Sequence, residues 1–510
     1  MAGRLAVEAF SEIQKQILST WSPDGCHLAA AAGGRLLVRE AEGLRLVQVC
    51  VCAGKVERIV WAPNSQHLLA EVPKQGIVDI WCIRDSEWHC RIDTGLAGLV
   101  RARWSPQSQH VLVFSDFQLY MSVWCLQSRR SLSQVPHPKF SARGVAFSRD
   151  NRWLALLRRE GCRDFLTVLA CEAFPSEATV EGCTAFQTLS DTVLDDMDCA
   201  DLAWGPGDAT LVLWERPCRS SCFLWYDPRG MLLARISDVG LPCRVAVSPS
   251  GALIAAGGLD GRVHLLSGAA RRLIACLQHD ITLACAEACE EEVNVLQQRT
   301  ALASGNGTNN TGGYDCSSRA AASTGALRRL SEGLELLAPP ATDPAAALHP
   351  DGACRSGVAA AEWSPDERHL VTRHESAPMA LWIWDVGRLK LDTVLIHASA
   401  VRAFAWDPAW SAAAAEETSP RLAIATAEHG LCFWTAGARS AIDANGENAA
   451  SIGDGESVLC PVAATKLEWR PDGRALLLRE RDRSCVCWCR GSAITAGTPG
   501  SLAAAARVGA

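Results

Sequence analysis

At 510 residues, the chain is too long for one ordinary hydrophobic core, which indicates several domains or a repeat array. Hydrophobic residues make up 48% and charged residues 21%, as in folded globular proteins, and the net charge of −7 argues against nucleic acid or anionic lipid as a partner. No apolar run has the ~18–20 residues of a membrane-spanning helix, and Glu8 and Glu12 stand where a secretory segment would be apolar. We therefore expect a protein that is neither inserted in a membrane nor secreted.

One turn sequence occurs nine times along the chain. It starts with an aromatic or apolar residue, here named the pivot, followed by a small residue, Pro and a polar turn pair, as in Trp21-Ser22-Pro23-Asp24-Gly25. The pivots are Trp21, Trp61, Trp104, Phe147, Trp204, Val247, Trp363, Trp406 and Trp469. Successive pivots are 40, 43, 43, 57, 43, 116, 43 and 63 residues apart. Four intervals equal 43, within the period of a four-stranded propeller blade, and the three longest indicate insertions.

The residues around each pivot predict short strands. Pro presets φ for the second position of a turn, and the polar pair that follows tolerates a tight return of the chain. A later strand in most repeats carries an aromatic residue, with Trp382 and Trp384 on one face of the strand in the seventh repeat. The corresponding residues elsewhere are Trp81, Trp124, Trp225 and Trp434, with Val38, Val168 and Leu265 in blades one, four and six. Such small sheets bury both faces only by stacking around a ring.

The sequence resembles the WD-repeat proteins, and most closely the WD-repeat-containing protein eight family of centrosomal and spindle-pole proteins. The resemblance rests on Glu87-Trp88-His89-Cys90-Arg91-Ile92-Asp93, on Leu381-Trp382-Ile383-Trp384-Asp385, and on Val401-Arg402-Ala403-Phe404-Ala405-Trp406-Asp407-Pro408. A Trp-Asp pair ends a third strand only at Trp384-Asp385, and the usual Gly-His dipeptide is absent. The Asp–His hydrogen-bond network of regular WD blades is therefore in question.

The resemblance implies a non-enzymatic scaffold in the cytoplasm and cytoskeleton, at centrosomes, spindle poles and basal bodies. Such a scaffold helps to anchor microtubule minus ends and supports spindle assembly and ciliogenesis. The implied partners are a coiled-coil centrosomal anchoring protein and, in some members, a minus-end-directed kinesin. Two alternatives remain open: a propeller scaffold in translation or RNA-associated complexes, and a hydrolase with catalytic groups in the central channel.

We expect an all-β protein, a WD-repeat-like β-propeller of seven to nine four-stranded blades with a long flexible insertion. Its parts are an N-terminal segment (1–16), blades one to six (17–280), a low-complexity and mostly disordered insertion (281–355), blades seven to nine (356–491) and a disordered tail (492–510). One ring accounts for the length better than two complete seven-bladed rings, which need about 600 residues. Two incomplete rings, split at the insertion, are the alternative. Within the insertion, residues 287–299 and 326–337 have the composition of short helices, and an inert loop is favoured over a partner-binding helix.

Glu87, Trp88 and His89 are the candidate partner-binding residues, because a run of Glu, Trp and His is unusual in a strand that only completes a sheet. The rival interpretation is that Trp88 packs between blades. His89 has no evident partner in the sequence, so a packed or surface-exposed histidine is favoured over a ligand or a base. Six arginines between Arg143 and Arg163 indicate either an ordinary solvated face or a basic patch for an acidic partner such as a tubulin tail.

The sequence predicts no enzyme activity, no cofactor and no metal site. Phosphate loops, nucleophile elbows and His-Glu-x-x-His helices do not occur in it. The 23 cysteines lack paired zinc-ligand spacing, and Cys485, Cys487 and Cys489 should lie on one face of a strand as small buried residues. The acidic run Asp195-Asp196-Met197-Asp198 is expected in a solvated loop rather than at a metal.

Overall fold

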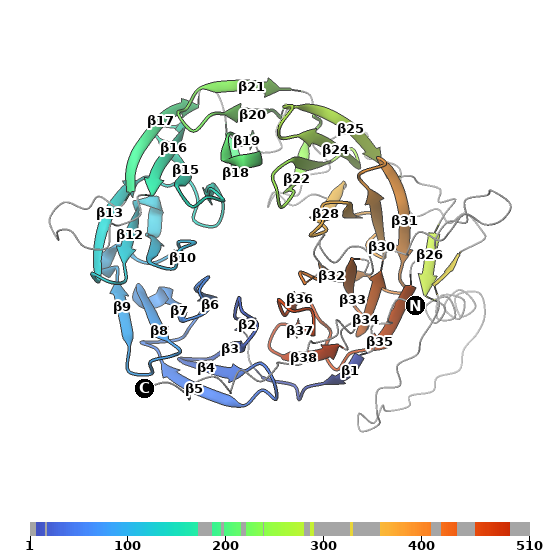
Figure 1. Cartoon of the computed structure of the whole chain (residues 1–510), viewed down its shortest axis with the longest axis horizontal. Coiled ribbons are helices and arrows are strands. Elements are labelled where there is room, and N and C mark those ends of the chain that lie inside the picture. Colours follow the sequence, from blue (N-terminus) through green and yellow to red (C-terminus); the bar gives the residue numbers. More distant parts are fainter. Residues whose placement is uncertain are drawn as a thin grey trace, which may run out of the picture.

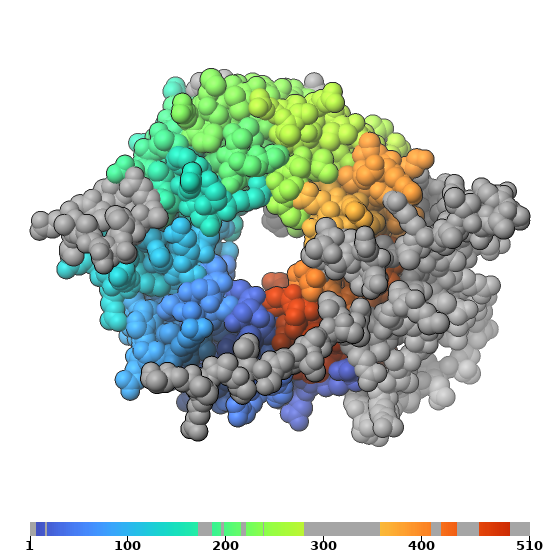
Figure 2. All heavy atoms as spheres, in the orientation of Figure 1, coloured from blue at the N-terminus to red at the C-terminus, as the bar shows by residue number. Residues whose placement is uncertain are grey.

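The structure, a computed structural model, describes residues 7–15, 18–171, 186–194, 198–215, 221–237, 239–279, 286–289, 327–329, 357–409, 420–435 and 454–489. These residues form nine sheets that follow one another around one closed ring (Figure 1). The ring surrounds a channel that stays open when all heavy atoms are drawn (Figure 2). The expected all-β propeller is confirmed with nine blades, and the alternative of two incomplete rings is wrong.

The first three blades follow the predicted 40–43-residue period. Blade one comprises β2 (Leu18–Trp21), β3 (His27–Ala32), β4 (Arg35–Glu40) and β5 (Leu46–Val51). Blade two comprises β6 (Arg58–Trp61), β7 (His67–Val72), β8 (Ile77–Cys82) and β9 (His89–Asp93). Blade three comprises β10 (Arg101–Trp104), β11 (His110–Phe114), β12 (Tyr120–Cys125) and β13 (Arg130–Pro136). The single-turn 3₁₀ helices η1 (Pro73–Gln75), η2 (Gly95–Ala97) and η3 (Asp116–Gln118) lie in their loops.

Blades four to six have the same order of strands. Blade four comprises β14 (Val145–Phe147), β15 (Trp153–Glu160), β16 (Arg163–Cys171) and β17 (Phe186–Leu194). Blade five comprises β18 (Cys199–Trp204), β19 (Leu211–Glu215), β20 (Phe223–Tyr226) and β21 (Leu232–Ile236), with η4 (Pro206–Asp208) in its first turn. Blade six comprises β22 (Pro242–Val247), β23 (Leu253–Gly258), β24 (Arg262–Ser267) and β25 (Arg272–Gln278).

The last three blades complete the ring. Blade seven comprises β28 (Val358–Trp363), β29 (His369–His374), β30 (Ala380–Asp385) and β31 (Lys390–Ile396). Blade eight comprises β32 (Val401–Trp406), β33 (Arg421–Thr426), β34 (Gly430–Thr435) and β35 (Asp454–Leu459). Blade nine comprises β36 (Lys466–Trp469), β37 (Ala475–Arg479), β38 (Ser484–Cys489) and, as its outer strand, β1 (Val7–Phe10).

The ring is closed by strand β1, which lies within the segment 1–16 and pairs antiparallel with β38 of the last blade, Phe10 opposite Cys487. The first and last parts of the chain therefore share one sheet, so that the ring cannot open without breaking this pairing. Cys485, Cys487 and Cys489 are buried together in the cluster between blades eight and nine, which confirms their predicted common face.

Two short strands from the long insertion add to the outer edge of blade seven. Strand β26 (Ala286–Cys289) pairs parallel with β31, and β27 (Leu327–Arg329) pairs antiparallel with β26. Residues 287–289 and 327–329 are therefore in strands rather than in the short helices that the composition allowed, because the edge of β31 offers unpaired backbone groups that another strand can use. The remainder of both predicted helices, the rest of 281–355 and the tail 492–510 lie outside the described residues.

Each blade buries its two faces against its two neighbours. In β7, Leu68 and Ala70 belong to the cluster shared with blade one, whereas Leu69 belongs to the cluster shared with blade three. This alternation follows from the period of two along a strand. The predicted third-strand aromatics lie within these clusters, fully buried at Trp225 and Trp382. The hydrophobic core is thus a series of interfaces between blades.

The pivot tryptophans also link blades by hydrogen bonds. The Trp61 indole N–H donates to the carbonyl of Thr20 in blade one (3.2 Å), and that of Trp104 donates to Val60 in blade two (3.1 Å). Three further blades repeat this bond at 3.0 Å, through Trp204 to Ala146, Trp363 to Ala246 and Trp469 to Ala405. The acceptor is always the residue before the preceding pivot, so the bond fixes the stagger of adjacent blades.

Blade seven keeps part of a WD-type polar network. The His279 ring lies 2.6 Å from the Gly261 carbonyl through Nδ1 and 2.8 Å from Thr372 Oγ1 through Nε2, and the Trp384 indole N–H donates to the same hydroxyl (2.8 Å). Because a carbonyl only accepts, Nδ1 carries the proton and Nε2 accepts from Thr372. All members are neutral, and the network joins blade six to blade seven on either side of the long insertion.

We predict that Trp104→Phe destabilises the protein more than Trp21→Phe. Both changes remove similar buried volume, but only the first removes an interblade donor, since the Trp21 indole nitrogen is buried without a hydrogen-bond partner among the described residues. We expect a difference of about 1–3 kcal/mol in the free energy of unfolding, measured by urea titration. Equal losses in the two variants would show that the indole bond contributes nothing.

A second prediction concerns the pH dependence of stability. Burial lowers the pKa of both His279 and His374 to about 4. Below pH ~6.5 the unfolded chain takes up protons that the folded ring does not, so each histidine should cost about 1.4 kcal/mol of stability per pH unit between pH 6.5 and 4. Urea unfolding between pH 7.5 and 5.5 measures this slope. His279→Phe should reduce the slope by about half, because His374 remains, and exposed His137→Asn should leave it unchanged; the same slope in all three proteins would contradict the prediction.

Candidate interaction site

The predicted site lies at the turn between β8 and β9 of blade two. Asp85 is the first residue of this turn. Its carboxylate accepts a hydrogen bond from the Glu87 N–H (3.0 Å), and its backbone carbonyl accepts one from the Trp88 N–H (3.2 Å). An Asx-type turn of this kind satisfies the backbone locally. Glu87 is exposed, whereas Trp88 and His89 are half-buried. The three residues are therefore adjacent in the chain but do not present a common surface.

Trp88 packs between blades two and three. Its ring meets that of His67 edge-on at 5.0 Å between centroids, and it lies against the cluster that these two blades share. The Arg129 guanidinium of blade three lies 5.9 Å from the Trp88 centroid, in the range of a cation–π contact. Part of this side chain thus stabilises the blade interface, as the rival interpretation expected, and part stays accessible.

His89 has a structural partner that the sequence did not reveal. Its Nε2 lies 3.1 Å from Oδ1 of the fully buried Asp79, and its ring stacks on Trp81 at 4.0 Å between centroids. Asp79 also accepts hydrogen bonds from Arg91 Nε (2.8 Å) and from the Ala53 backbone N–H (2.8 Å). His89 is therefore a packed histidine with a structural role, as favoured from the sequence over a ligand or a base. In the sequence, the available indication of this role was that Asp79 is a charged residue inside the otherwise apolar run Ile77–Cys82.

The arginines of blade four do not form a free basic patch. Arg158 is buried and pairs with Asp191 (2.8 Å), and Arg159 pairs with Asp164 (2.7 Å) and Asp198 (2.9 Å). Of the other four, Arg149 and Arg152 lie 3.6 and 3.9 Å from Asp208 and Asp150, and Arg143 lies over the Phe140 ring. Most of the positive charge expected for an acidic partner is thus compensated within the blade and its neighbours.

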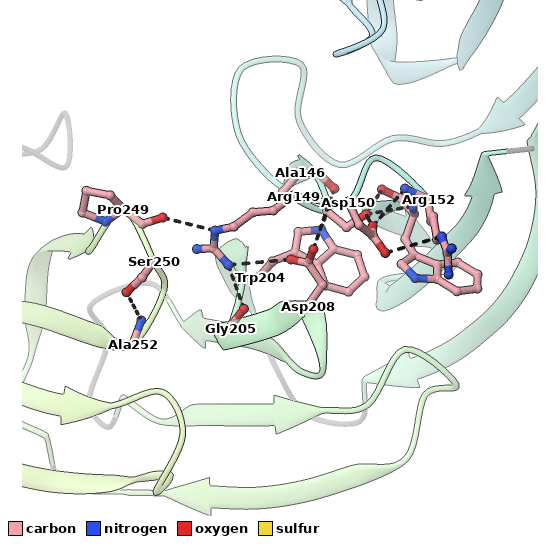
Figure 3. Close-up of polar contacts among 12 residues, drawn as sticks. Ala146, Arg149, Asp150, Arg152, Trp204, Gly205, Asp208, Pro249, Ser250 and Ala252 are labelled. Carbon is pink, nitrogen blue, oxygen red and sulfur yellow. Dashed lines mark hydrogen bonds and ion pairs between the residues drawn. The ribbon is translucent and has the colours of Figure 1, made fainter. Parts of the chain in front are cut away.

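Arg149 occupies the Pro position of the degenerate fourth turn and extends across two neighbouring blades (Figure 3). Its guanidinium donates to the carbonyls of Gly205 in blade five (2.9 Å) and Pro249 in blade six (3.1 Å). In the same turn, the Asp150 N–H donates to Asp208 of blade five (2.9 Å). This arginine therefore links blade four to blades five and six, and the pivot of blade six, Val247, has no indole N–H to donate to blade five.

Turn-to-turn bonds recur on this face of the ring. The Asp24 N–H donates to Ser65 Oγ of the next blade (2.9 Å), and the Asn64 N–H donates to Ser108 Oγ (3.0 Å). The accepting residue comes four positions after its pivot and has a positive φ, 58° at Ser65 and 61° at Ser108. Such backbone costs free energy in a residue other than glycine, and the interblade bond offsets this cost. The pivot turns on this face of the ring therefore link neighbouring blades.

A buried lysine joins blades four and five. Lys139 is 2% exposed, and its Nζ lies 2.6 Å from Asp164, 2.7 Å from Asp198 and 2.6 Å from the Cys199 carbonyl. Asp198 belongs to the acidic run that was expected in a solvated loop, and it instead takes part in this ion cluster. The other three residues of the run lie outside the described part. A buried cation of this kind must be fully paired, which makes the cluster structural.

Neither metal-binding nor membrane-spanning features occur in the described part of the chain. Within the described ranges, no three His, Cys, Asp or Glu side chains converge as metal ligands would. The same residues include no helix with the length and apolarity needed to cross a bilayer.

Nine four-stranded blades, pivot turns and a His–Thr–Trp network define the class of protein as a divergent WD-repeat propeller. The chain is 31% identical to the mouse (Mus musculus) WD repeat-containing protein WRAP73 over 477 residues, 92% of this chain and 93% of that protein. It therefore belongs to the WD-repeat protein eight family, to which WRAP73 belongs.

Other comparisons support only the fold. A solved structure described as a eukaryotic initiation factor aligns with a TM-score of 0.50 at 10% identity, covering 82% of this chain and 85% of that one. No protein-family model matches the sequence.

We predict that His89→Ala destabilises the protein and that Glu87→Ala does not. The first change removes a hydrogen-bond partner of the buried Asp79 and the stacking on Trp81, with an expected cost of about 1–2 kcal/mol in the free energy of unfolding. The second alters an exposed side chain and should stay within about 0.5 kcal/mol. Thermal and urea unfolding of both variants test this distinction, and a stable His89→Ala protein would contradict it.

Proposed function

We propose that this protein is a non-enzymatic scaffold of the centrosome, spindle pole and basal body, where it helps to anchor microtubule minus ends and supports spindle assembly and ciliogenesis. The observation that carries the proposal is the end-to-end similarity to WRAP73, which spans 92% of this chain. An alignment of this extent includes the whole ring rather than a few blade motifs. A closed ring that presents many loops is suited to holding several partners at once.

The proposed partners are a coiled-coil centrosomal anchoring protein and a minus-end-directed kinesin. Glu87 and the accessible part of Trp88 form the proposed contact with the first of these. A half-buried Trp held by its own blade interface is a pre-ordered anchor, and such residues often dominate interface energies. His89 supports this surface through Asp79 and is better described as a positioning residue.

The alternative, a scaffold in translation or RNA-associated complexes, has no specific support. The similarity to the initiation factor is at 10% identity and concerns the fold, and the net charge of −7 disfavours RNA. Imaging a tagged copy through the cell cycle separates the two proposals. Foci at spindle poles or basal bodies are the expected result, and a diffuse or ribosome-associated distribution would contradict the centrosomal role.

We predict that Glu87→Arg weakens binding to the coiled-coil anchoring protein by tenfold or more, since it reverses the charge beside Trp88 without changing the fold. Glu160→Arg provides the matched control, because Glu160 is also exposed but lies on blade four. Pull-down with purified proteins and thermal melting of both variants are the measurements. Wild-type binding by a normally folded Glu87→Arg protein would remove this residue from the interface.

A further inference from the structure

The outer strand of blade seven, β31, ends in an apolar stretch that packs on both of its faces. Val394 and Ile396 belong to the cluster between blades six and seven, and Leu395 belongs to the cluster between blades seven and eight. Thr393, just before them, is also buried. Among the outer strands whose side chains the structure describes, β31 alone buries successive residues. The ring itself therefore holds this stretch in one conformation, which lowers the entropy cost of adding a further strand to it.

The outer side of this stretch is suited to pairing with another strand. N–H and C=O groups along a sheet edge can bind any extended segment, and natural proteins usually place charged residues or proline there to prevent it. Thr393–Ile396, here named the β31 edge, contains neither. The two charged residues of the strand, Lys390 and Asp392, come before it. The β31 edge thus lacks the usual protection against strand addition, and in this structure a strand does add to it.

The strand that covers this edge has the features of a weak partner. β26 pairs with β31 from Ala286 opposite Val394 to Ala288 opposite Ile396, outside the ring (Figure 1). This pairing is parallel, unlike the antiparallel pairing of β31 with β30 on its other side, and parallel pairs are slightly less stable per residue. The sequence of β26 is Ala-Glu-Ala-Cys, and alanine and glutamate are depleted in strands. A strand of β-branched residues should therefore pair with this edge more strongly than β26 does.

The covering strand is not part of any four-stranded blade. Among the described residues, β26 and β27 pair only with each other and with β31. Without them, every blade keeps its four strands, and the ring remains closed through β1 and β38. A strand from another protein can thus replace β26 without opening the ring.

We propose that the β31 edge is a binding site for an extended, uncharged segment of a partner protein rich in β-branched residues, and that β26 occupies this site until such a segment replaces it. Main-chain hydrogen bonds would supply most of the affinity, as in other complexes that form by strand addition. Because β26 is tethered to the ring, it competes at a high effective concentration. It therefore sets the affinity that a partner must exceed.

This site is distinct from the one that contains Glu87. The β31 edge lies on the outer rim of blade seven, whereas the β8–β9 turn belongs to blade two, across the ring (Figure 1). The ring would thus hold two partners at separate places on its circumference. Because the partner segment is recognised by its backbone and its β-branched residues, the inference does not depend on the cellular location proposed above.

The test uses the full chain and a fluorescent peptide, Lys-Thr-Val-Thr-Val-Thr-Val-Lys, with terminal lysines for solubility. Ala286→Pro with Ala288→Pro should uncover the edge, because proline cannot donate to the ladder and is excluded from strand interiors. Anisotropy should show that this variant binds the peptide about tenfold more tightly than the wild type, since the tethered competitor is lost. The matched control is Asn309→Pro with Asn310→Pro, in the same insertion but outside β26 and β27, and it should bind like wild type. A peptide with N-methylated valines should bind to none of these proteins.

Hydrogen exchange locates the binding and tests the opposite change. The amides of Val394–Ile396 should exchange faster in the proline variant than in the wild type, and the peptide should restore their protection. Ala286→Val with Ala288→Val raises the strand propensity of β26, so the same amides should exchange more slowly than in the wild type.

Melting and mass measurements decide between the remaining outcomes. All variants should melt within about 2 °C of the wild type, because β26 lies outside the nine four-stranded blades. A much larger drop in the proline variant would show that β26 is an integral part of the fold and would overturn the proposal. So would equal peptide binding by the wild type and the proline variant, or protection by the peptide at another edge. A dimer of the proline variant that excludes the peptide would assign the edge to a second copy of the chain and also overturn it.

Discussion

The whole ring depends on one constraint, which is that a four-stranded sheet with two apolar faces is stable only between two like neighbours. Each blade therefore needs a fixed distance and stagger to the next. At five interfaces a pivot indole supplies both, because its ring fills the interface while its N–H donates to the inner strand of the preceding blade, as at Trp104 and Val60. Pairing of β1 with β38 extends the same constraint to the last interface and closes the ring.

Charged and polar residues form different hydrogen-bond and ion-pair arrangements in different interfaces. Blade two places Asp79 under His89 and Arg91, blades four and five share the buried Lys139, and blade seven uses the neutral network of His279 and Thr372. Each solution satisfies its buried groups, as a medium of low polarity requires. A regular WD repeat has one network repeated in every blade, whereas here these three networks differ from one another. This diversity agrees with a divergent branch of the repeat class.

Ion pairing within the blades also removes most arginines of blade four as candidates for binding a partner. Arginines that look available in the sequence, such as Arg158 and Arg159, are committed to carboxylates within blade four. Several side chains at loop ends are instead exposed, as at Glu87, Leu96 and Phe117. A rigid ring with exposed side chains at loop ends is well suited to act as a scaffold.

The sequence by itself determined the repeat unit, because turn chemistry and the alternation of apolar residues are local properties of the chain. The pivot spacing, the third-strand aromatics and the buried face of Cys485, Cys487 and Cys489 all followed from it. Only the tertiary structure decided that nine blades close into one ring through β1, and that His89 rests on Asp79. These features join residues on different strands and blades. Their pairing depends on the register of strands and the stagger of blades, which no local pattern specifies.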